Sequence, residues 1–421
     1  RTLFQLTSYA QACEEGAWLD IRIDTADPAR NPPKPDLRKM LVPLGPVVVF
    51  GASNFPFAYS TAGGDTACAL AAGCPVVLKA HPAHAETSEM VAGAVQAAAK
   101  ECGLPGSVFI HIHGAGFEVG KALVLHPLTA AVGFTGSLEG GRALFDLANS
   151  RAKPIPVFAE MGSVNPVFLL PQKLAKDGEQ VAAQYAVSIT QSVGQFCTNP
   201  GVLVGIESDA LDSFKKALGF KIAAVPPAEM LHPGIAKAFQ HKRAGVLEVD
   251  GVRIVGTLSC PVGRLESIPT LAEVSADLFL QNHLLQEEVF GPFSLLVRCK
   301  DAAQMLAVAK AMDGQLTCSL IATEEDAAAS LELIETLRAR CGRIIFNGVP
   351  TGVEVALAMH HGGPYPATTD SRFTAVGADG IKRFARPVCY QNFPDALLPQ
   401  ELQAANPLGL WRTVNGELVK S

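Results

Sequence analysis

The sequence predicts an α/β protein made of two units, each with a parallel sheet covered by helices on both faces. The chain has 421 residues, more than one compact core usually holds. Apolar residues make up 48% and charged residues 18%, a balance typical of well-buried globular proteins and opposite to that of disordered chains. Short apolar segments bounded by glycine alternate with helical segments, which is the pattern of parallel sheets.

The first unit follows an N-terminal helix expected at 2–16. The segment 23–39 is rich in proline and charge, so we expect an extended arm or linker there instead of core. Strands and helices then alternate. The strands are expected at 47–52, 75–80, 107–113 and 130–136, and the helices at 61–72, 85–101 and 117–125.

The second unit begins near residue 164 and repeats the alternation with its own apolar strands. Its strands are expected at 164–170, 201–206, 293–299, 318–323 and 342–347, and its helices at 176–193, 301–312 and 324–340. The tail from 363 is rich in proline, glycine and aromatic residues and has little periodicity. We expect it to pack over other elements or over a neighbouring subunit.

Charge and hydropathy argue against two classes of partner. The net charge is −6 and no run of Lys or Arg forms a basic patch, so nucleic acid is not expected. The longest apolar stretches, 42–52 and 72–80, are interrupted by proline or lysine, and we expect no membrane span. The scattered cysteines form no CxxC pair, so we expect reduced thiols in a cytoplasmic protein. The chain begins without Met or a signal-peptide pattern, so we expect the sequence here to start mid-protein, inside a helix.

One of the ten cysteines stands in an unusual context. None forms a CxxC pair, zinc-ligand spacing is missing, and no metal is assigned. Cys197 lies in "QSVGQFCTNPG", after a polar helix end and before a turn, where pockets commonly form. From these residues alone, two alternatives stay open: a nucleophile, or a small residue that fills a gap.

Seven motifs in a fixed order identify a resemblance to a known family. They are "GASNFPF", "GCPVVLKAHP", "GFTGS", "AEMGSVNP", "GQFCTNPG", "EEVFGP" and "FNGVPTG". The chain resembles the aldehyde dehydrogenase superfamily from about residue 40 to about residue 365. The resemblance implies two doubly wound, Rossmann-like α/β domains with an oligomerisation arm.

The resemblance implies the roles of three catalytic residues. Cys197 matches the nucleophile that attacks the aldehyde carbon. Asn54 matches the side-chain donor to the oxyanion, and the backbone N–H of Cys197 supplies the other donor. Glu160 matches the general base that activates water against the thioester. Without the resemblance, Asn54 reads equally well as a turn residue and Glu160 better as a solvated strand end.

The same resemblance implies a nicotinamide cofactor and its contacts. Lys79 matches the residue that binds the adenosine-side ribose. Many members that prefer NAD have a glutamate three residues later, whereas this chain has Pro82, so we expect NADP, with NAD possible. His81 or Lys121 are further candidates for the 2′-phosphate.

Four more residues match family contacts to the cofactor. Gly136 and Ser137 lie where a strand runs into a helix whose N-terminus suits a pyrophosphate. Glu288 and Phe290 match the residues that hold the nicotinamide ribose and ring. Read without the resemblance, these last two are an ordinary loop acid and a core aromatic.

The ending "HHGGPYPATTDSR" and the phrase "AEMGSVNPVF" are similar to one branch of the family. It includes NADP-preferring 2-oxoglutarate semialdehyde (2,5-dioxopentanoate, or 2,5-dioxovalerate) dehydrogenases and bacterial fatty aldehyde dehydrogenases. We expect the semialdehyde as substrate, with a fatty aldehyde, a CoA-acylating reaction or a silent nucleotide-binding member as alternatives. His360 and His361 are expected at the surface, although one could orient the thiol or bind a substrate carboxylate.

The resemblance also divides the chain and implies an assembly. It places an N-terminally incomplete cofactor-binding domain at 1–162, with an oligomerisation arm at 25–43. The catalytic domain covers 163–362, and a C-terminal bridging and oligomerisation region covers 363–421. A homodimer or homotetramer is expected.

Overall fold

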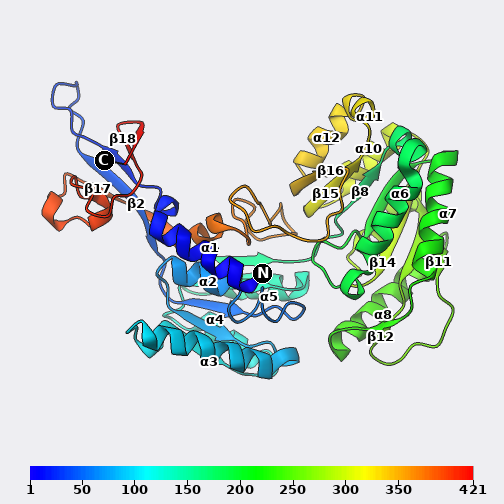
Figure 1. The fold of residues 1–421 in the computed structure, drawn as a ribbon, viewed down its shortest axis with the longest axis horizontal. Coiled ribbons are helices and arrows are strands. Elements are labelled where there is room, and N and C mark those ends of the chain that lie inside the picture. Colours follow the sequence, from blue (N-terminus) through cyan, green and yellow to red (C-terminus); the bar gives the residue numbers. More distant parts are fainter. Residues whose placement is uncertain (421) are drawn as a thin grey trace.

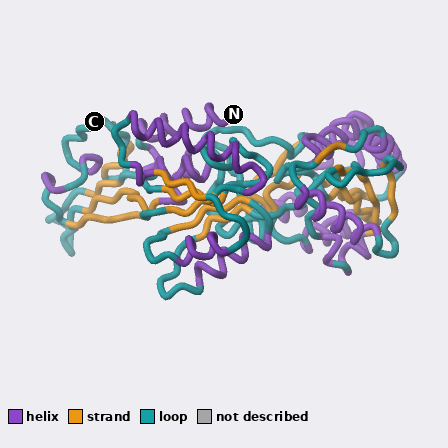
Figure 2. Tube along the Cα trace, turned by 90° about the horizontal axis from the view of Figure 1, so that it is seen from below, coloured by secondary structure: helices purple, strands orange, loops and turns teal. Residues whose placement is uncertain are grey.

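The computed structural model describes residues 1–420, which form three large sheets and one two-stranded ribbon. The three large sheets follow one another along the longest axis of the molecule (Figure 1). The sheet that contains β2, β17 and β18 lies at one end and the sheet that contains β14 and β15 at the other. Figure 2 shows strands as a middle layer with helices on both sides.

The middle sheet is the first predicted unit. Its five strands are parallel and run in the order β5-β4-β3-β6-β7. The strands are β3 (Val47–Phe50), β4 (Val76–Lys79), β5 (Phe109–Ile112), β6 (Ala131–Thr135) and β7 (Val157–Glu160). The helices are α1 (Thr2–Glu15), α2 (Gly64–Ala71), α3 (Ala85–Glu101), α4 (Glu118–Leu125) and α5 (Leu138–Asn149). The predicted strands and helices of this unit are confirmed, including the strand that ends at Glu160 and the helix that begins after Ser137.

The second unit has a seven-stranded sheet in the order β11-β13-β14-β9-β8-β15-β16. All neighbours are parallel except β11, which is an antiparallel edge. The strands are β8 (Val167–Leu169), β9 (Val202–Ile206), β11 (Arg253–Thr257), β13 (Thr270–Ser275), β14 (Phe293–Cys299), β15 (Gln315–Ile321) and β16 (Cys341–Phe346). The helices are α6 (Pro171–Thr190), α7 (Asp209–Ala223), α8 (Pro233–Leu247), α9 (Ala276–Gln281), α10 (Ala302–Ala311), α11 (Glu324–Ala328) and α12 (Leu331–Arg338).

Two details of this unit differ from the prediction. The single helix expected at 324–340 is two helices, because Ser330 leaves helical geometry at φ −121° and ψ 32°. The helices α7, α8 and α9 and the strands β11 and β13 lie between 207 and 292, where no element was predicted. The ribbon β10 (Ala228–Glu229) and β12 (Glu266–Ser267) falls in the same interval.

The third sheet joins the proline-rich arm to the tail. It contains β1 (Arg22–Asp24), β2 (Leu37–Pro43), β17 (Ala385–Gln391), β18 (Arg412–Val414) and β19 (Glu417–Val419). The order is β17-β2-β1-β18-β19, and β2 pairs with β17 over seven residues. Met40, Ile23 and Leu402 are buried in a small core of this sheet. The arm is therefore not a free linker, because the tail supplies strands that pair with it.

Short 3₁₀-helices complete the chain. They are η1 (Ala17–Leu19), η2 (Pro82–His84), η3 (Gly106–Val108), η4 (Gln191–Gly194), η5 (His283–Gln286), η6 (Ala378–Phe384), η7 (Asp395–Leu397) and η8 (Gln400–Leu402). No helix among residues 1–420 is long and apolar enough to cross a lipid bilayer.

Candidate active site

A cavity of about 1160 Å³ lies between the middle sheet and the seven-stranded sheet. The middle sheet contributes segments at the carboxyl ends of its strands, near the neighbours β3 and β6, between which the strand order reverses and where open sheets usually bind ligands. The seven-stranded sheet contributes segments that precede its strands. All nine predicted site residues line this cavity: Asn54, Lys79, Pro82, Gly136, Ser137, Glu160, Cys197, Glu288 and Phe290.

A tight left-handed turn carries Cys197 into the cavity. After α6 ends, Ser192, Val193 and Gly194 have φ values of 50°, 58° and 63°. The left-handed region is costly for a β-branched residue such as Val193, so the surrounding packing must hold the turn in place. A Cβ on Gly194 would lie 2.3 Å from the backbone of Gly291, so only glycine fits here.

A buried asparagine fixes the loop on the other side of the thiol. The Asn165 side-chain amide donates to the carbonyl oxygens of Cys197 and Asn199, both at 2.9 Å. Its Oδ1 accepts from Thr317 at 3.1 Å, which connects the loop to β15. The Asn199 side chain in turn donates to the Gly291 carbonyl at 3.1 Å. The nucleophile loop is therefore held by hydrogen bonds to two neighbouring segments.

His361 lies between the thiol and the predicted base. Its Nε2 is 3.4 Å from Cys197 Sγ and 3.1 Å from Glu160 Oε1. His361 is 1% exposed and Glu160 4% exposed, and Glu160 Oε2 has no hydrogen-bond partner among residues 1–420. The expectation of a surface histidine was wrong for His361, because the segment after it returns to the end of β7 and buries the ring.

Close backbone contacts explain why this returning segment contains two glycines. A Cβ on Gly363 would lie 2.0 Å from the Gln315 carbonyl oxygen. The segment then runs beside β7, where the Met161 N–H donates to the Ala367 carbonyl at 2.8 Å. His361 itself is held by its backbone N–H, which donates to Thr374 Oγ1 at 2.9 Å. The histidine is thus positioned by both sheets.

The resting form of the nucleophile follows from its surroundings. Burial, followed by the negative charge of Glu160 and then of Glu288, raises the pKa of the Cys197 thiol well above its ordinary value. Cys197 is therefore a thiol at neutral pH in the free protein. A neighbouring base must take its proton before the sulfur can attack, and His361 Nε2 is within reach.

Two N–H groups are available near the thiol for a developing oxyanion. The Asn54 amide follows β3 and donates one hydrogen bond to the Gln195 carbonyl at 3.0 Å, which leaves its second N–H. The backbone N–H of Cys197 makes no hydrogen bond to any other residue in the described part of the chain. These are the two donors that the family resemblance implies.

Glu288 packs against the backbone that follows β7. A Cβ on Gly162 would lie 2.7 Å from Glu288 Oε2, so Gly162 makes room for the carboxylate. Burial raises the pKa of Glu288 to about 7, with the charge of Lys242 opposing the shift. The side chain therefore titrates near neutral pH and faces the same cavity as Phe290.

The far end of the cavity carries a cation without a partner. Lys79 ends β4, is half-buried, and its ammonium has no hydrogen bond or ion pair with residues 1–420. Burial lowers its pKa. Pro82 begins η2 three residues later, so no carboxylate stands at that position, and Lys121 lines the same end. This region suits an anionic ligand.

The N-terminus of α5 opens into the cavity between these two ends. Ser137 caps the helix, and its Oγ accepts from the Gly140 N–H at 3.1 Å. A Cβ on Gly136 would lie 2.6 Å from the Phe134 ring, so the glycine leaves room for that ring beside the cavity. The free N–H groups of the first turn favour a phosphate here.

Two site residues were missed by the sequence reading. Asn165 lies inside the motif "AEMGSVNP", and its left-handed φ of 46° before a proline is a pattern that asparagine tolerates. Arg343 in β16 is half-buried; burial lowers the pKa of its guanidinium, and a negative charge on Cys197 would oppose that shift. Neither has a local sequence signal that assigns a role, since both act through contacts distant in the chain.

Comparison with known proteins agrees with this geometry. The chain is 49% identical over 418 residues to "Alpha-ketoglutaric semialdehyde dehydrogenase 2" of Azospirillum brasilense, covering 99% of this chain and 80% of that protein. It is 47% identical over 423 residues to "Alpha-ketoglutaric semialdehyde dehydrogenase" of Acinetobacter baylyi, covering 100% of this chain and 80% of that protein.

Solved structures show the same fold. A gamma-glutamyl-gamma-aminobutyraldehyde dehydrogenase from Burkholderia cenocepacia superposes with a TM-score of 0.74 at 22% identity, over 93% of this chain and 75% of that one. A succinic semialdehyde dehydrogenase from Streptococcus pyogenes gives 0.74 at 15% identity, over 92% and 81%. The model of the aldehyde dehydrogenase family matches residues 9–384. With its cysteine, carboxylate and asparagine gathered in one cavity, the chain belongs to the aldehyde dehydrogenase family.

Proposed function

We propose that the protein oxidises 2-oxoglutarate semialdehyde to 2-oxoglutarate with NADP. The observation that carries the proposal is the Cys197 thiol beside His361 and Glu160, in a cavity that continues to the unpaired Lys79. The two relatives named alpha-ketoglutaric semialdehyde dehydrogenases support the substrate, because the similarity extends over the whole chain.

The chain's own residues account for the steps at the aldehyde. His361 takes the thiol proton, and the Cys197 sulfur bonds to the aldehyde carbon to give a tetrahedral thiohemiacetal. Its oxyanion accepts from the Asn54 amide and the Cys197 N–H, and one such donor contributes about 2.7–4 kcal/mol in known enzymes. The bound cofactor supplies the hydride acceptor. Glu160 then removes a proton from water, which attacks the thioester and releases the carboxylate and the thiol.

The residues present fit a dinucleotide with an extra phosphate. Glu288 and Phe290 would hold the nicotinamide ribose and ring, and Ser137 with Gly136 the pyrophosphate. Lys79 would bind the adenosine ribose, with His81 or Lys121 near the 2′-phosphate. Pro82 leaves no carboxylate to repel that phosphate.

The choice of NADP has a direct test. In Pro82→Glu, we expect kcat/KM for NADP to fall about tenfold or more while kcat/KM for NAD changes little, because like charges repel. Steady-state kinetics with both cofactors measures this ratio, and Pro105→Glu, in the turn before η3, is the control. A wild-type protein that prefers NAD would contradict the proposal.

Arg343 supports a substrate with a distal carboxylate. Its guanidinium donates to the carbonyls of Pro350 and Gly352 and lies near enough to Cys197 that a thiolate there would oppose the lowering of the Arg343 pKa by burial. Its Nε is buried without a partner among the described residues. An arginine so placed could bind the far carboxylate of a semialdehyde, whereas a fatty aldehyde would gain nothing from it.

The substrate experiment compares aldehydes of varied length with and without a terminal carboxylate. We expect kcat/KM to be highest for 2-oxoglutarate semialdehyde, and Arg343→Met to raise KM for it without raising KM for an uncharged aldehyde of equal length. A preference for long uncharged aldehydes would favour the fatty aldehyde alternative. Product analysis with and without CoA separates hydrolysis from acyl transfer, since acyl transfer would yield a CoA thioester.

We also propose a homodimer or homotetramer assembled through the third sheet. In this division, the cofactor-binding domain covers 1–162 and the catalytic domain with the nucleophile covers 163–362. The subunits are joined by the arm at 25–43, which is part of the first domain, and by the C-terminal region at 363–421. Trp411 and Leu418 are 48% and 68% exposed on this sheet, and Ile344 and Phe346 on the edge strand β16 are 41% and 51% exposed. Light scattering on Leu418→Glu and on the matched control Leu128→Glu tests whether this sheet holds the subunits together.

A further inference from the structure

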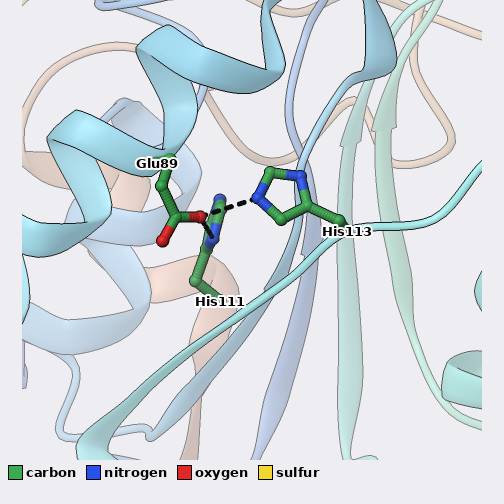
Figure 3. A group of neighbouring side chains, drawn as sticks. All are labelled: Glu89, His111 and His113. Carbon is green, nitrogen blue, oxygen red and sulfur yellow. Dashed lines mark hydrogen bonds and ion pairs between the residues drawn. The ribbon is translucent and has the colours of Figure 1, made fainter.

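Outside the cavity, two histidines and a glutamate converge at an edge of the middle sheet (Figure 3). Glu89 belongs to α3, His111 to β5, and His113 lies one residue beyond β5. Their candidate ligand atoms all lie within 4.8 Å of one another. None of the three lines the cavity, so the dehydrogenase chemistry does not explain them.

The backbone explains why the side chains meet. Residues two apart on an extended segment point to the same face, which brings His111 and His113 together on the face that α3 covers. Their rings are 4.6 Å apart and perpendicular. Glu89 Oε2 lies 3.2 Å from His111 Nδ1 and 2.7 Å from His113 Nε2, so one carboxylate oxygen faces both imidazoles.

A second layer of hydrogen bonds holds the buried member of the group. His111 Nε2 lies 2.8 Å from Ser88 Oγ, and Ser88 Oγ lies 2.5 Å from Thr61 Oγ1. Ser88 and Thr61 are both completely buried. A partner on the outer ring nitrogen is the usual device that fixes the orientation of a metal-binding histidine, and here it leaves Nδ1 facing Glu89.

The composition of the group selects the kind of ion. Imidazole nitrogens with one carboxylate suit zinc and other late first-row metals, whereas magnesium and calcium prefer oxygen ligands alone. Ligand distances of about 2.0–2.2 Å require the three atoms to separate slightly from their present contacts. Glu89 and His113 side chains are 67% and 49% exposed, so both are free to make that adjustment.

We propose that Glu89, His111 and His113 form a zinc site with one coordination position open to water. Such an ion would connect α3 to the edge strand β5. The neighbouring strand β4 carries Lys79, which pairs in register with Ile112, so the ion would stabilise the part of the sheet next to the proposed cofactor site. The expected effect is a gain in thermal stability and not a requirement for turnover.

The binding experiment must exclude a second group that could take the same ion. Glu160, Cys197 and His361 also have ligand atoms within 4.8 Å of one another, so zinc is titrated into chelator-treated Cys197→Ser protein. We expect one bound zinc by calorimetry and a rise in melting temperature. Glu89→Gln and His113→Gln should each weaken binding at least tenfold, while His126→Gln, an exposed histidine elsewhere, should not.

Cobalt distinguishes the two groups in the protein with Cys197 intact. Cobalt at the proposed site has no thiolate ligand and should show only weak visible bands, whereas cobalt on Cys197 would add an intense near-ultraviolet charge-transfer band. Circular dichroism checks that each variant is folded. Zinc binding with unchanged affinity and stoichiometry in the Glu89→Gln/His113→Gln double variant, or no zinc binding by the parent protein, would overturn the proposal.

Discussion

The two sheets that enclose the cavity contribute to it from opposite ends of their strands. The middle sheet places Asn54, Lys79, Ser137 and Glu160 at or just after the carboxyl ends of its strands. The seven-stranded sheet instead places Cys197 on a segment that precedes one of its strands. Strand ends with helix N-termini suit a nucleotide, whereas the nucleophile needs a loop fixed by side-chain hydrogen bonds. We therefore expect substitutions on the middle sheet to affect mainly cofactor binding, and substitutions on the seven-stranded sheet to affect mainly the chemistry at the thiol.

The largest difference between the effect on turnover and the effect on cofactor affinity is expected for Cys197, the nucleophile next to the seven-stranded sheet. Cys197→Ala removes the only thiol among the described residues that line the cavity, so turnover should fall by roughly four orders of magnitude or more. NADP affinity, measured by calorimetry, should remain within about twofold, because the proposed phosphate contacts lie on the other sheet. Cys260→Ala is the control. Residual dehydrogenase activity at the wild-type level would remove Cys197 from its role.

Glu160 is an exception to this division between the two sheets. It ends β7 of the middle sheet, but its carboxylate lies on the same side of the cavity as the Cys197 thiol. In Glu160→Gln, acylation should proceed while hydrolysis of the thioester slows by about 10²–10⁴-fold, the usual range for a general base. Stopped-flow absorbance should show one equivalent of NADPH per site followed by a stall. Glu118→Gln, at the exposed start of α4, should behave as wild type. A normal steady state in Glu160→Gln would argue against this base.

Asn165 tests whether the loop needs its side-chain support. Asn165→Ala leaves the carbonyls of Cys197 and Asn199 without their shared donor, so the free energy of unfolding should fall by about 2–4 kcal/mol. We also expect kcat to fall more than the affinity for NADP. Urea denaturation and steady-state kinetics measure the two effects. Asn149→Ala on α5 is a matched exposed control, and equal losses in both variants would contradict the assigned support.

The smallest expected effect is a change in the pH dependence of KM for the cofactor, and it concerns Glu288, which lines the cavity between the two sheets. Its pKa of about 7 means that the carboxylate becomes ionised as the pH rises through neutrality, and the ionised form accepts more strongly from ribose hydroxyls. KM for the cofactor should therefore decrease severalfold between pH 6 and pH 8. In Glu288→Gln this dependence should flatten. A pH profile unchanged by the substitution would place the titrating group elsewhere.

The sequence predicted the strands of the middle sheet and the site residues at their ends well, because both are encoded by residues close together in the chain. Segments such as 47–50 and 76–78 are continuous apolar runs, and Asn54, Lys79 and Ser137 lie within four residues after the end of such a run. The fold class and the family resemblance are confirmed by the match to the family model and by the superposed structures. Placement in the cavity was predictable wherever a motif adjoins a strand.

Other features depend on contacts that no local pattern reveals. His361 is buried only because the segment after it returns to β7, more than two hundred residues earlier in the chain. The tail has little periodicity of its own, so its sequence does not predict the strand β17. This strand is defined by its pairing with β2, which is distant in the chain. Glu89 and His113 likewise carry no metal-ligand spacing, since α3 and β5 bring them together.

The protonated state of Cys197 in the free protein also bears on chemical resistance. A thiol reacts far more slowly than a thiolate with peroxides and alkylating agents. The resting protein should therefore lose its exposed cysteines, Cys13, Cys102 and Cys389, to such reagents first. A sulfur that becomes nucleophilic only after its proton leaves is protected from oxidative damage between catalytic cycles, which would lengthen the working life of the enzyme under peroxide stress.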